Sequence, residues 1–203
     1  MTTTRALASA LATTLALTGT ALLSGCANLH QVTADVSSYG TWPASRKPGT
    51  YAFERLPSQK SNPLEQDALE QAAMPALEAA GFKLEAAAKA DVLVQVSAQT
   101  QARPSPFSDP VGPRWGVGWG WGWGGPRGSM GLGMSMEPPW WQLQVDALIR
   151  DRASHEVLYE AHARHERAGS VEGLAEPLFR AALIDFPIPA VSPRPVTVEL
   201  PKR

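Results

Sequence analysis

The sequence predicts an α+β domain in which two helices pack on one face of a small antiparallel sheet of three to four strands. Apolar residues recur at helical spacing between Leu64 and Ala80, but they alternate with polar residues between Trp141 and Ile149. Helices that are separated along the chain from paired strands are typical of a two-layer α+β architecture.

The first expected elements are a short strand and an amphipathic helix. Tyr51-Ala52-Phe53 places two aromatic side chains on one face of a strand. Asn62 followed by Pro63 is typical of a helix N-terminus, and Gly81 of a helix end. Pro75 lies inside this helix and removes one backbone hydrogen bond, so we expect a kink or a broken last turn.

Three further strands and a second helix complete the expected domain. The apolar run at 92–96 predicts a central, buried strand. Residues 141–149 predict a half-buried strand, and 156–167 its hairpin partner. Ser170 is a candidate cap of the last helix. Residues 188–203 are rich in proline, which indicates an extended tail.

The N-terminus resembles the signal segment of a bacterial lipoprotein. Arg5 precedes an apolar segment rich in alanine and leucine, and Leu23-Ser24-Gly25-Cys26 follows it. We therefore predict a signal peptide at 1–25 and lipidation of Cys26, the only cysteine of the chain. Two or more acyl chains hold a protein stably on a membrane. The alternatives are a plain secretory signal and an uncleaved membrane helix, for which the segment is too polar.

The predicted domain spans residues 50–187 and is joined to the lipid by a tether. Residues 26–49 are polar and rich in turn-forming residues, which favours a flexible connection. Alternatively, Val32, Val36 and Tyr39 belong to the first packed segment. By resemblance to sorted lipoproteins of Gram-negative bacteria, Ala27 after the cysteine implies the outer membrane, with the domain facing the periplasm.

The most unusual segment is a Gly- and Trp-rich insertion at 103–139. Six of the seven tryptophans lie between positions 115 and 141. Indoles in such a segment stack on the sugars of a glycan, lie among lipid headgroups or bind a protein. The alternative is a hairpin extension that packs its tryptophans on the sheet. Four residues are therefore candidate contacts for a ligand or partner: Trp115, Trp119, Trp121 and Trp123.

The sequence predicts no catalytic residues and no metal or cofactor site. His162 and His165 differ by three positions on the expected strand, so they point to opposite faces. The G-x-S-x-G motif of serine hydrolases is absent. Asp91 is a candidate carboxylate at the start of a buried strand, although hydrogen bonding to nearby backbone amides is the simpler role.

Several short motifs occur in a characteristic order along residues 26–187. They are the lipidated cysteine, Tyr51-Ala52-Phe53, Gly81-Phe82, Ala90-Asp91-Val92-Leu93-Val94, the Gly/aromatic insertion, a strand pair, and a helix that ends in Phe186-Pro187. This order resembles the bacterial lipoproteins grouped as domain of unknown function 4136. Tyr159 departs from the family pattern, in which tryptophan is expected. The family has no established catalytic residues, so the resemblance implies an envelope lipoprotein and no particular reaction.

These observations favour a non-enzymatic outer-membrane lipoprotein that binds or scaffolds an envelope component, either a protein or a glycan. Nucleic acid is not an expected partner, because the formal net charge is −1 and basic runs are absent. One alternative is an envelope hydrolase, which requires His162 or His165 beside a carboxylate in a pocket. Another is a copper-handling protein that uses thioether ligands; the candidates are Met130, Met134 and Met136.

Overall fold

The computed structural model describes residues 30–105 and 139–201, which form one seven-stranded sheet with helices on one side. The strand order is β3-β2-β4-β5-β6-β1-β7. The strands are β1 (Gln31–Gly40), β2 (Thr50–Phe53), β3 (Lys83–Leu84), β4 (Val92–Arg103), β5 (Trp140–Asp151), β6 (Val157–Ala168) and β7 (Arg194–Glu199). The helices are α2 (Pro57–Lys60), α3 (Pro63–Ala79) and α4 (Ala175–Ala182).

The predicted fold class was wrong in both the size and the type of the sheet. We expected three to four antiparallel strands and two helices, but the sheet has seven strands and is mixed. Strand β2 runs parallel to both β3 and β4, and the remaining pairs are antiparallel. The parallel pairing follows from the crossover through α3, which returns the chain to the end of the sheet where β2 begins.

Two of the additional strands come from segments that we expected outside the packed domain. Strand β1 lies within the predicted tether and pairs with both β6 and β7, and its residues Val32 and Val36 are buried. These two valines therefore pack in the core, whereas Tyr39 of the same strand is 39% exposed. Strand β7 lies within the predicted tail and forms an edge of the sheet. An edge strand tolerates Pro195, whose nitrogen cannot donate a hydrogen bond.

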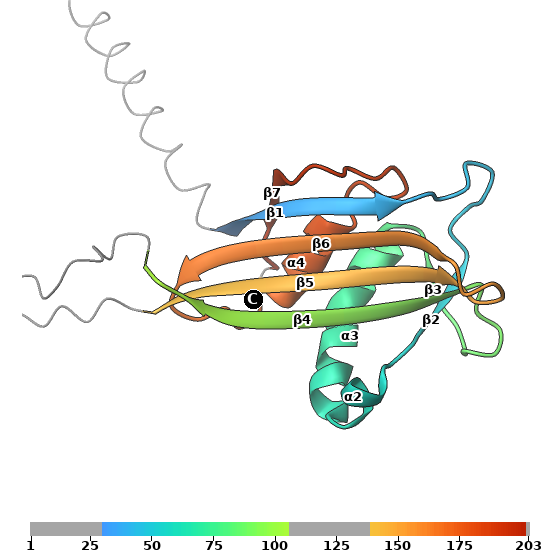
Figure 1. Ribbon diagram of the computed structural model, residues 1–203, viewed down its shortest axis with the longest axis horizontal. Coiled ribbons are helices and arrows are strands. Elements are labelled where there is room, and N and C mark those ends of the chain that lie inside the picture. Colours follow the sequence, from blue (N-terminus) through green and yellow to red (C-terminus); the bar gives the residue numbers. More distant parts are fainter. Residues whose placement is uncertain (1–29, 106–138, 202–203) are drawn as a thin grey trace, which may run out of the picture.

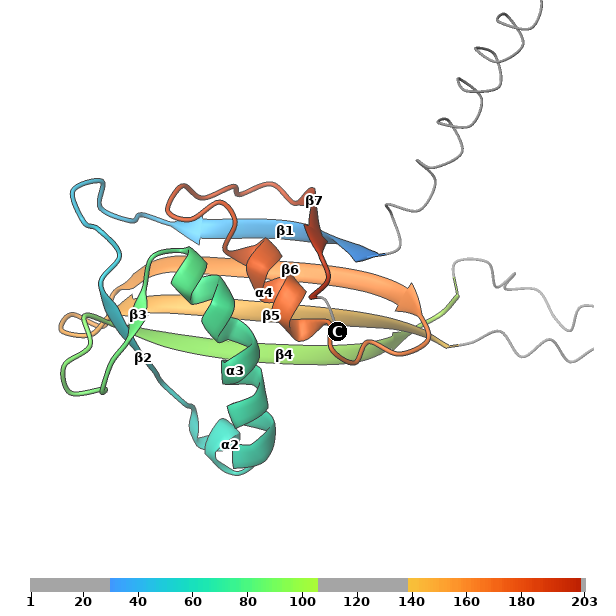
Figure 2. The same cartoon turned by 180° about the vertical axis from the view of Figure 1, so that it is seen from behind.

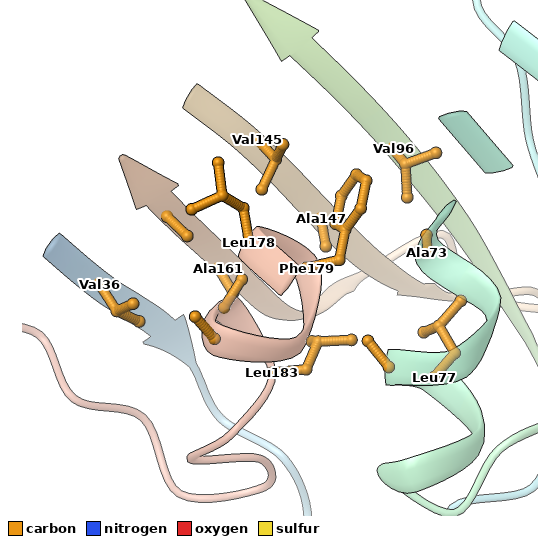
Figure 3. Close-up of a cluster of buried hydrophobic side chains, with 14 of the residues drawn as sticks. Val36, Ala73, Leu77, Val96, Val145, Ala147, Ala161, Leu178, Phe179 and Leu183 are labelled. Carbon is orange, nitrogen blue, oxygen red and sulfur yellow. The ribbon is translucent and has the colours of Figure 1, made fainter. Parts of the chain in front are cut away.

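The hydrophobic core lies between the sheet and helices α3 and α4, which lie across the same face (Figure 2). Helix α4 contacts β5, β6, β1 and β7, and α3 contacts β4 and α4. Leu178 and Phe179 of α4 are fully buried among residues of the central strands (Figure 3). Alternate strand residues supply the other side of this core: Val94, Val96, Val145, Ala147, Ile149, Tyr159, Ala161 and Ala163.

Helix α3 begins and ends close to the positions that the sequence indicates. Asn62 precedes it, and Gly81 follows it with a φ of 93°. The helix continues through Pro75 to Ala79, so the expected break in its last turn is absent. Its buried side includes Ala76 and Leu77, which pack towards α4 and the sheet.

An aromatic cluster around Phe186 links the last helix to the sheet and to the segment after β1. The Phe186 ring centroid lies 4.8 Å from that of Trp42 and 5.1 Å from those of Phe82 and Tyr159. Aromatic pairs at such separations contribute about 0.5–1.5 kcal/mol beyond their buried area. Tyr159 therefore packs as part of the core, where the resemblance led us to expect tryptophan.

Gly40, at the end of β1, is a position at which glycine is required. Its φ is 131°, and a Cβ atom there would lie 2.4 Å from the backbone oxygen of Leu158. We expect Gly40→Ala to lower the free energy of unfolding by about 3 kcal/mol or more, because backbone strain and a backbone clash act together. The measurement is urea denaturation followed by circular dichroism.

Gly173 provides the matched control for this experiment. Its φ is 75°, but a Cβ atom there would meet no atom within 4 Å. Gly173→Ala should therefore lower the free energy of unfolding by only about 1 kcal/mol, because only the backbone conformation is strained. An equal loss of unfolding free energy in the two variants would contradict the close contact between Gly40 and the backbone of β6.

Candidate functional site

The side of the sheet opposite α3 and α4, which we call the open face, is polar and carries no helix of the described residues (Figure 1). Side chains alternate along a strand, so the neighbours of the core residues point to this side. They surround a hollow of about 290 Å³ near the middle of the sheet. The residues that line it are Gln95, Ser97, Gln144, Asp146, Ala147, Leu148, Glu160 and His162.

Asp146 and His162 lie at the centre of this hollow because the strand register places them directly opposite each other. Asp146 of β5 is paired with Ser97 of β4 on one side and with His162 of β6 on the other. His162 is in turn paired with Ser37 of β1. Four adjacent strands therefore each place one polar residue at the same level of the open face.

Hydrogen bonds connect Ser97, Asp146 and His162 with Gln144 and Glu160, two further residues of β5 and β6 on the same face. The Ser97 hydroxyl donates to Asp146 Oδ2 over 3.0 Å, and the Gln144 amide donates to Asp146 Oδ1 over 2.8 Å. His162 Nδ1 lies 2.7 Å from Asp146 Oδ1, and its Nε2 lies 3.0 Å from Glu160 Oε1. Each ring nitrogen thus faces a carboxylate oxygen. We refer to Ser97, Asp146, Glu160 and His162 as the polar row.

The polar row does not have the geometry of a catalytic triad. A nucleophilic serine needs a base that accepts its proton, and that base must have a free nitrogen. The Ser97 hydroxyl is bonded to Asp146 rather than to His162, and both nitrogens of His162 face carboxylates. His162 meets the first condition of the hydrolase hypothesis, a histidine beside a carboxylate in a pocket, but the described residues supply no activated nucleophile.

The other histidines of this hairpin lie elsewhere. His165 points to the side opposite His162, as its spacing predicts, and its Nδ1 lies 2.7 Å from the backbone oxygen of Thr33. His155 lies in the turn between β5 and β6 with a φ of 60°. Within residues 30–105 and 139–201, no group of three or more His, Cys, Asp or Glu residues is placed to hold a metal ion.

Several predicted site residues lie outside the described residues. They are Cys26, the four tryptophans Trp115, Trp119, Trp121 and Trp123, and the methionines Met130, Met134 and Met136. Among the helices of the described part, none is long and apolar enough to cross a membrane.

Asp91 holds the start of β4 to β2 and is remote from the polar row. Its Oδ2 accepts hydrogen bonds from the Thr50 backbone nitrogen over 2.8 Å and from the Thr50 hydroxyl over 2.9 Å. A Cβ atom at Gly49 would lie 2.4 Å from this oxygen, so the carboxylate occupies the space that glycine leaves. The bonds from Thr50 lower the pKa of Asp91. The simpler structural role expected for Asp91 fits this geometry.

Asp151 closes the same end of the sheet. It accepts hydrogen bonds from the backbone nitrogens of Ser154 and Ala153, and it pairs with Arg46 over 2.8 Å. The pKa of Asp151 is held well below its usual range, mainly by the hydrogen bond from the Ser154 backbone. The Arg46 guanidinium and the hydrogen bond from the Ala153 backbone lower it further. Both carboxylates thus favour the folded state in their ionised form.

This arrangement predicts a loss of stability in acid. Because the pKa values of Asp91 and Asp151 are lower in the folded than in the unfolded chain, their contribution is complete above about pH 5 and falls as the pH drops through the folded values. We expect Asp151→Asn to lower the melting temperature at neutral pH and to reduce its further decline in acid. The measurement is thermal denaturation across a pH series.

Asp35→Asn is the control, since Asp35 is exposed and its pairing with Arg164 is long, at 3.7 Å. It should leave both the melting temperature and its pH dependence close to those of the unchanged protein. An acid profile of Asp151→Asn that runs parallel to that of the unchanged protein would contradict the role of this carboxylate.

The polar row was missed in the sequence because its members are far apart along the chain. Asp146 and Gln144 were recognised only as polar positions of an alternating strand. His162 was considered only for the hydrolase alternative, and its carboxylate partner was not identified. The available signal was that two consecutive strands of a hairpin, 141–149 and 156–167, both carry polar residues on alternate positions. Only the register shows that these residues meet.

The architecture is similar to part of a solved structure. A PDZ domain protein from Parabacteroides distasonis matches with a TM-score of 0.51 and 16% identity, over 83% of this chain and 38% of that chain. This chain therefore spans about two fifths of that protein's length, and the likeness concerns the fold alone. The PelC dodecamer from Paraburkholderia phytofirmans matches with a TM-score of 0.40 and 11% identity, over 74% of this chain and 94% of that one.

The comparison with curated proteins gave no match. The sequence pattern of a family described as a domain of unknown function, DUF4136, matches residues 35–188. This range includes most of β1 and extends beyond α4, so it contains the polar row and both helices of the core. The match covers more than half of the chain, and the protein belongs to the DUF4136 family.

Proposed function

We propose that the protein is a lipid-anchored binding module of the bacterial outer membrane that uses the open face of its sheet to bind a polar envelope component. The observation that supports this most directly is the polar row at the centre of a sheet face that no helix of residues 30–105 and 139–201 covers. A shallow, polar hollow built on rigid strands, without an activated nucleophile, is suited to recognition rather than to reaction.

The chemistry of the hollow favours a ligand with many hydroxyl groups, so a glycan is the preferred class and a polar protein segment the alternative. Hydroxyl groups donate to the carboxylates of Asp146 and Glu160 and accept from the amides of Gln95 and Gln144. Two carboxylates against one histidine disfavour an anionic ligand. The Tyr39 ring, whose centroid lies 6.0 Å from that of His162, adds an aromatic surface beside the row.

The anchor is supported by the sequence around Cys26 and by the position of β1. The sheet begins at Gln31, five residues after the cysteine, so a lipid on Cys26 would hold the domain close to the membrane. An extended chain spans about 3.3–3.6 Å per residue, which limits this separation to about 18 Å. The tether is therefore much shorter than the one that we expected from the sequence.

Ligand binding is tested with the chain from residue 26 to 203 carrying Cys26→Ser, by co-sedimentation with peptidoglycan sacculi. The double variant Asp146→Asn, His162→Gln should bind at least tenfold more weakly, because it removes the carboxylate and the imidazole whose hydrogen bonds orient the row. The control is Glu172→Gln, an exposed residue of the loop before α4, which should bind normally.

Deletion of residues 112–136 separates this proposal from binding through the tryptophans. If only the deletion reduces binding, the contact belongs to Trp115, Trp119, Trp121 and Trp123, and the polar row is not the site. A folded double variant that binds as well as the unchanged protein contradicts the proposal, and near-ultraviolet circular dichroism verifies that it is folded.

The anchor is tested by metabolic labelling with radioactive palmitate in a Gram-negative host. The unchanged protein should incorporate label and sediment with outer-membrane vesicles, and Cys26→Ser should do neither, because no other thiol exists in the chain. Absence of label in the unchanged protein, or its persistence in Cys26→Ser, would refute lipidation at this residue.

A further inference from the structure

One end of the sheet brings together the start of β1, the end of β4 and the start of β5. Gln31, the first residue of β1, is paired with Glu199 near the end of β7. Trp140, the first residue of β5, is paired with Arg103 at the end of β4 and with Ala168 at the end of β6. Figure 1 shows the start of β1, the end of β4 and the start of β5 at this same end. We call it the anchor end, since Cys26 lies just before it in the chain.

The anchor end carries a tryptophan and an arginine on each side of the sheet. Trp140 has the same parity along β5 as Asp146 and belongs to the open face, where its neighbour across the strands is Arg103. Trp141 belongs to the helix-covered side, and its neighbour is Arg167. Both indoles are partly buried, and both arginines are exposed.

This composition is typical of residues at a membrane surface. Indoles are enriched at the level of lipid headgroups, and arginine side chains extend their charge towards phosphates while their methylene groups cover apolar surface. The exposed Glu166 and Glu199 at this end offset the two arginine charges. The indoles, rather than net charge, are therefore the main source of attraction.

We propose that the anchor end, through Arg103, Trp140, Trp141 and Arg167, contacts the phospholipid headgroups of the membrane that holds the lipid on Cys26. This inference rests on the lipid anchor of the proposed function and adds an orientation to it. The strands stand away from the membrane, and the turn between β5 and β6 lies about 40 Å farther out, since a strand residue spans about 3.3 Å. The polar row then lies between the two ends, accessible beside the membrane.

The orientation is tested by nuclear magnetic resonance on the chain from Cys26 to Arg203. Its single thiol is coupled to a maleimide phospholipid in nanodiscs of phosphatidylethanolamine and phosphatidylglycerol that also contain a gadolinium-chelating lipid. Gadolinium broadens the signals of nearby amides. We expect strong broadening at Gln31, Ala168 and Leu200, and sharp signals at Ala153 and Ser154 in the turn between β5 and β6. Equal broadening at both ends, or stronger broadening at this turn, would overturn the proposal.

The role of the indoles is tested with the double variant Trp140→Ala, Trp141→Ala. It should reduce the difference between the two ends by broadening Ala153 and Ser154, because the domain then tilts on its short tether, which still holds Gln31 near the membrane. The control is Leu84→Ala, which removes an apolar side chain that is 53% exposed on β3, at the other end of the sheet, and it should keep the profile of the unchanged protein. A folded double variant with an unchanged profile would contradict the contact, and the unchanged protein alone decides the orientation if that variant fails to fold.

Chemical coupling of the lipid separates this test from the proposed function. A negative result with the coupled lipid refutes the membrane contact even where palmitate labelling shows that cells lipidate Cys26. Conversely, a positive result stands even if labelling fails, because the coupled lipid holds the chain at the same residue.

Discussion

The structure depends on the burial of helix α4 against the middle of the sheet. Leu178 and Phe179 are fully buried there, and burial of such side chains stabilises a fold by about 1.5–3 kcal/mol each. The strand residues of the same core cluster include Ala147, Ala161 and Ala163, whose small side chains leave room for the helix to approach. Because side chains alternate along a strand, this burial also determines which residues face away from the helices.

The polar row is a consequence of the same alternation. Asp146 lies between the core residues Val145 and Ala147, and His162 lies between Ala161 and Ala163. A shift of one residue in the pairing of β5 with β6 would turn these charged side chains into the core and expose the alanines. The hydrophobic pattern therefore fixes the position of the row, and its hydrogen bonds are formed between strands that are already held in place.

Local patterns in the sequence predicted some elements well and others not at all. The alternation at 141–149 and the signals at Asn62, Pro63 and Gly81 correspond to β5 and α3. Strand β1 was taken for a tether because its buried positions include Ala34 and Ser38, which have little preference for strands. Ser38 is buried through hydrogen bonds with the backbone of Ala190, a contact between distant segments. The site was missed for the same reason: pairing across strands determines it.

Hydroxyl-radical footprinting of the chain from residue 26 to 203 tests most directly the claim that one side of the sheet is buried and the other is available to a ligand. The account predicts rapid oxidation of Tyr39 and His162 on the open face, and protection of Leu178 and Phe179 beneath it. Protection of Tyr39 and His162 that is as strong as that of Phe179 would contradict the account, because another part of the chain would then cover the face assigned to binding.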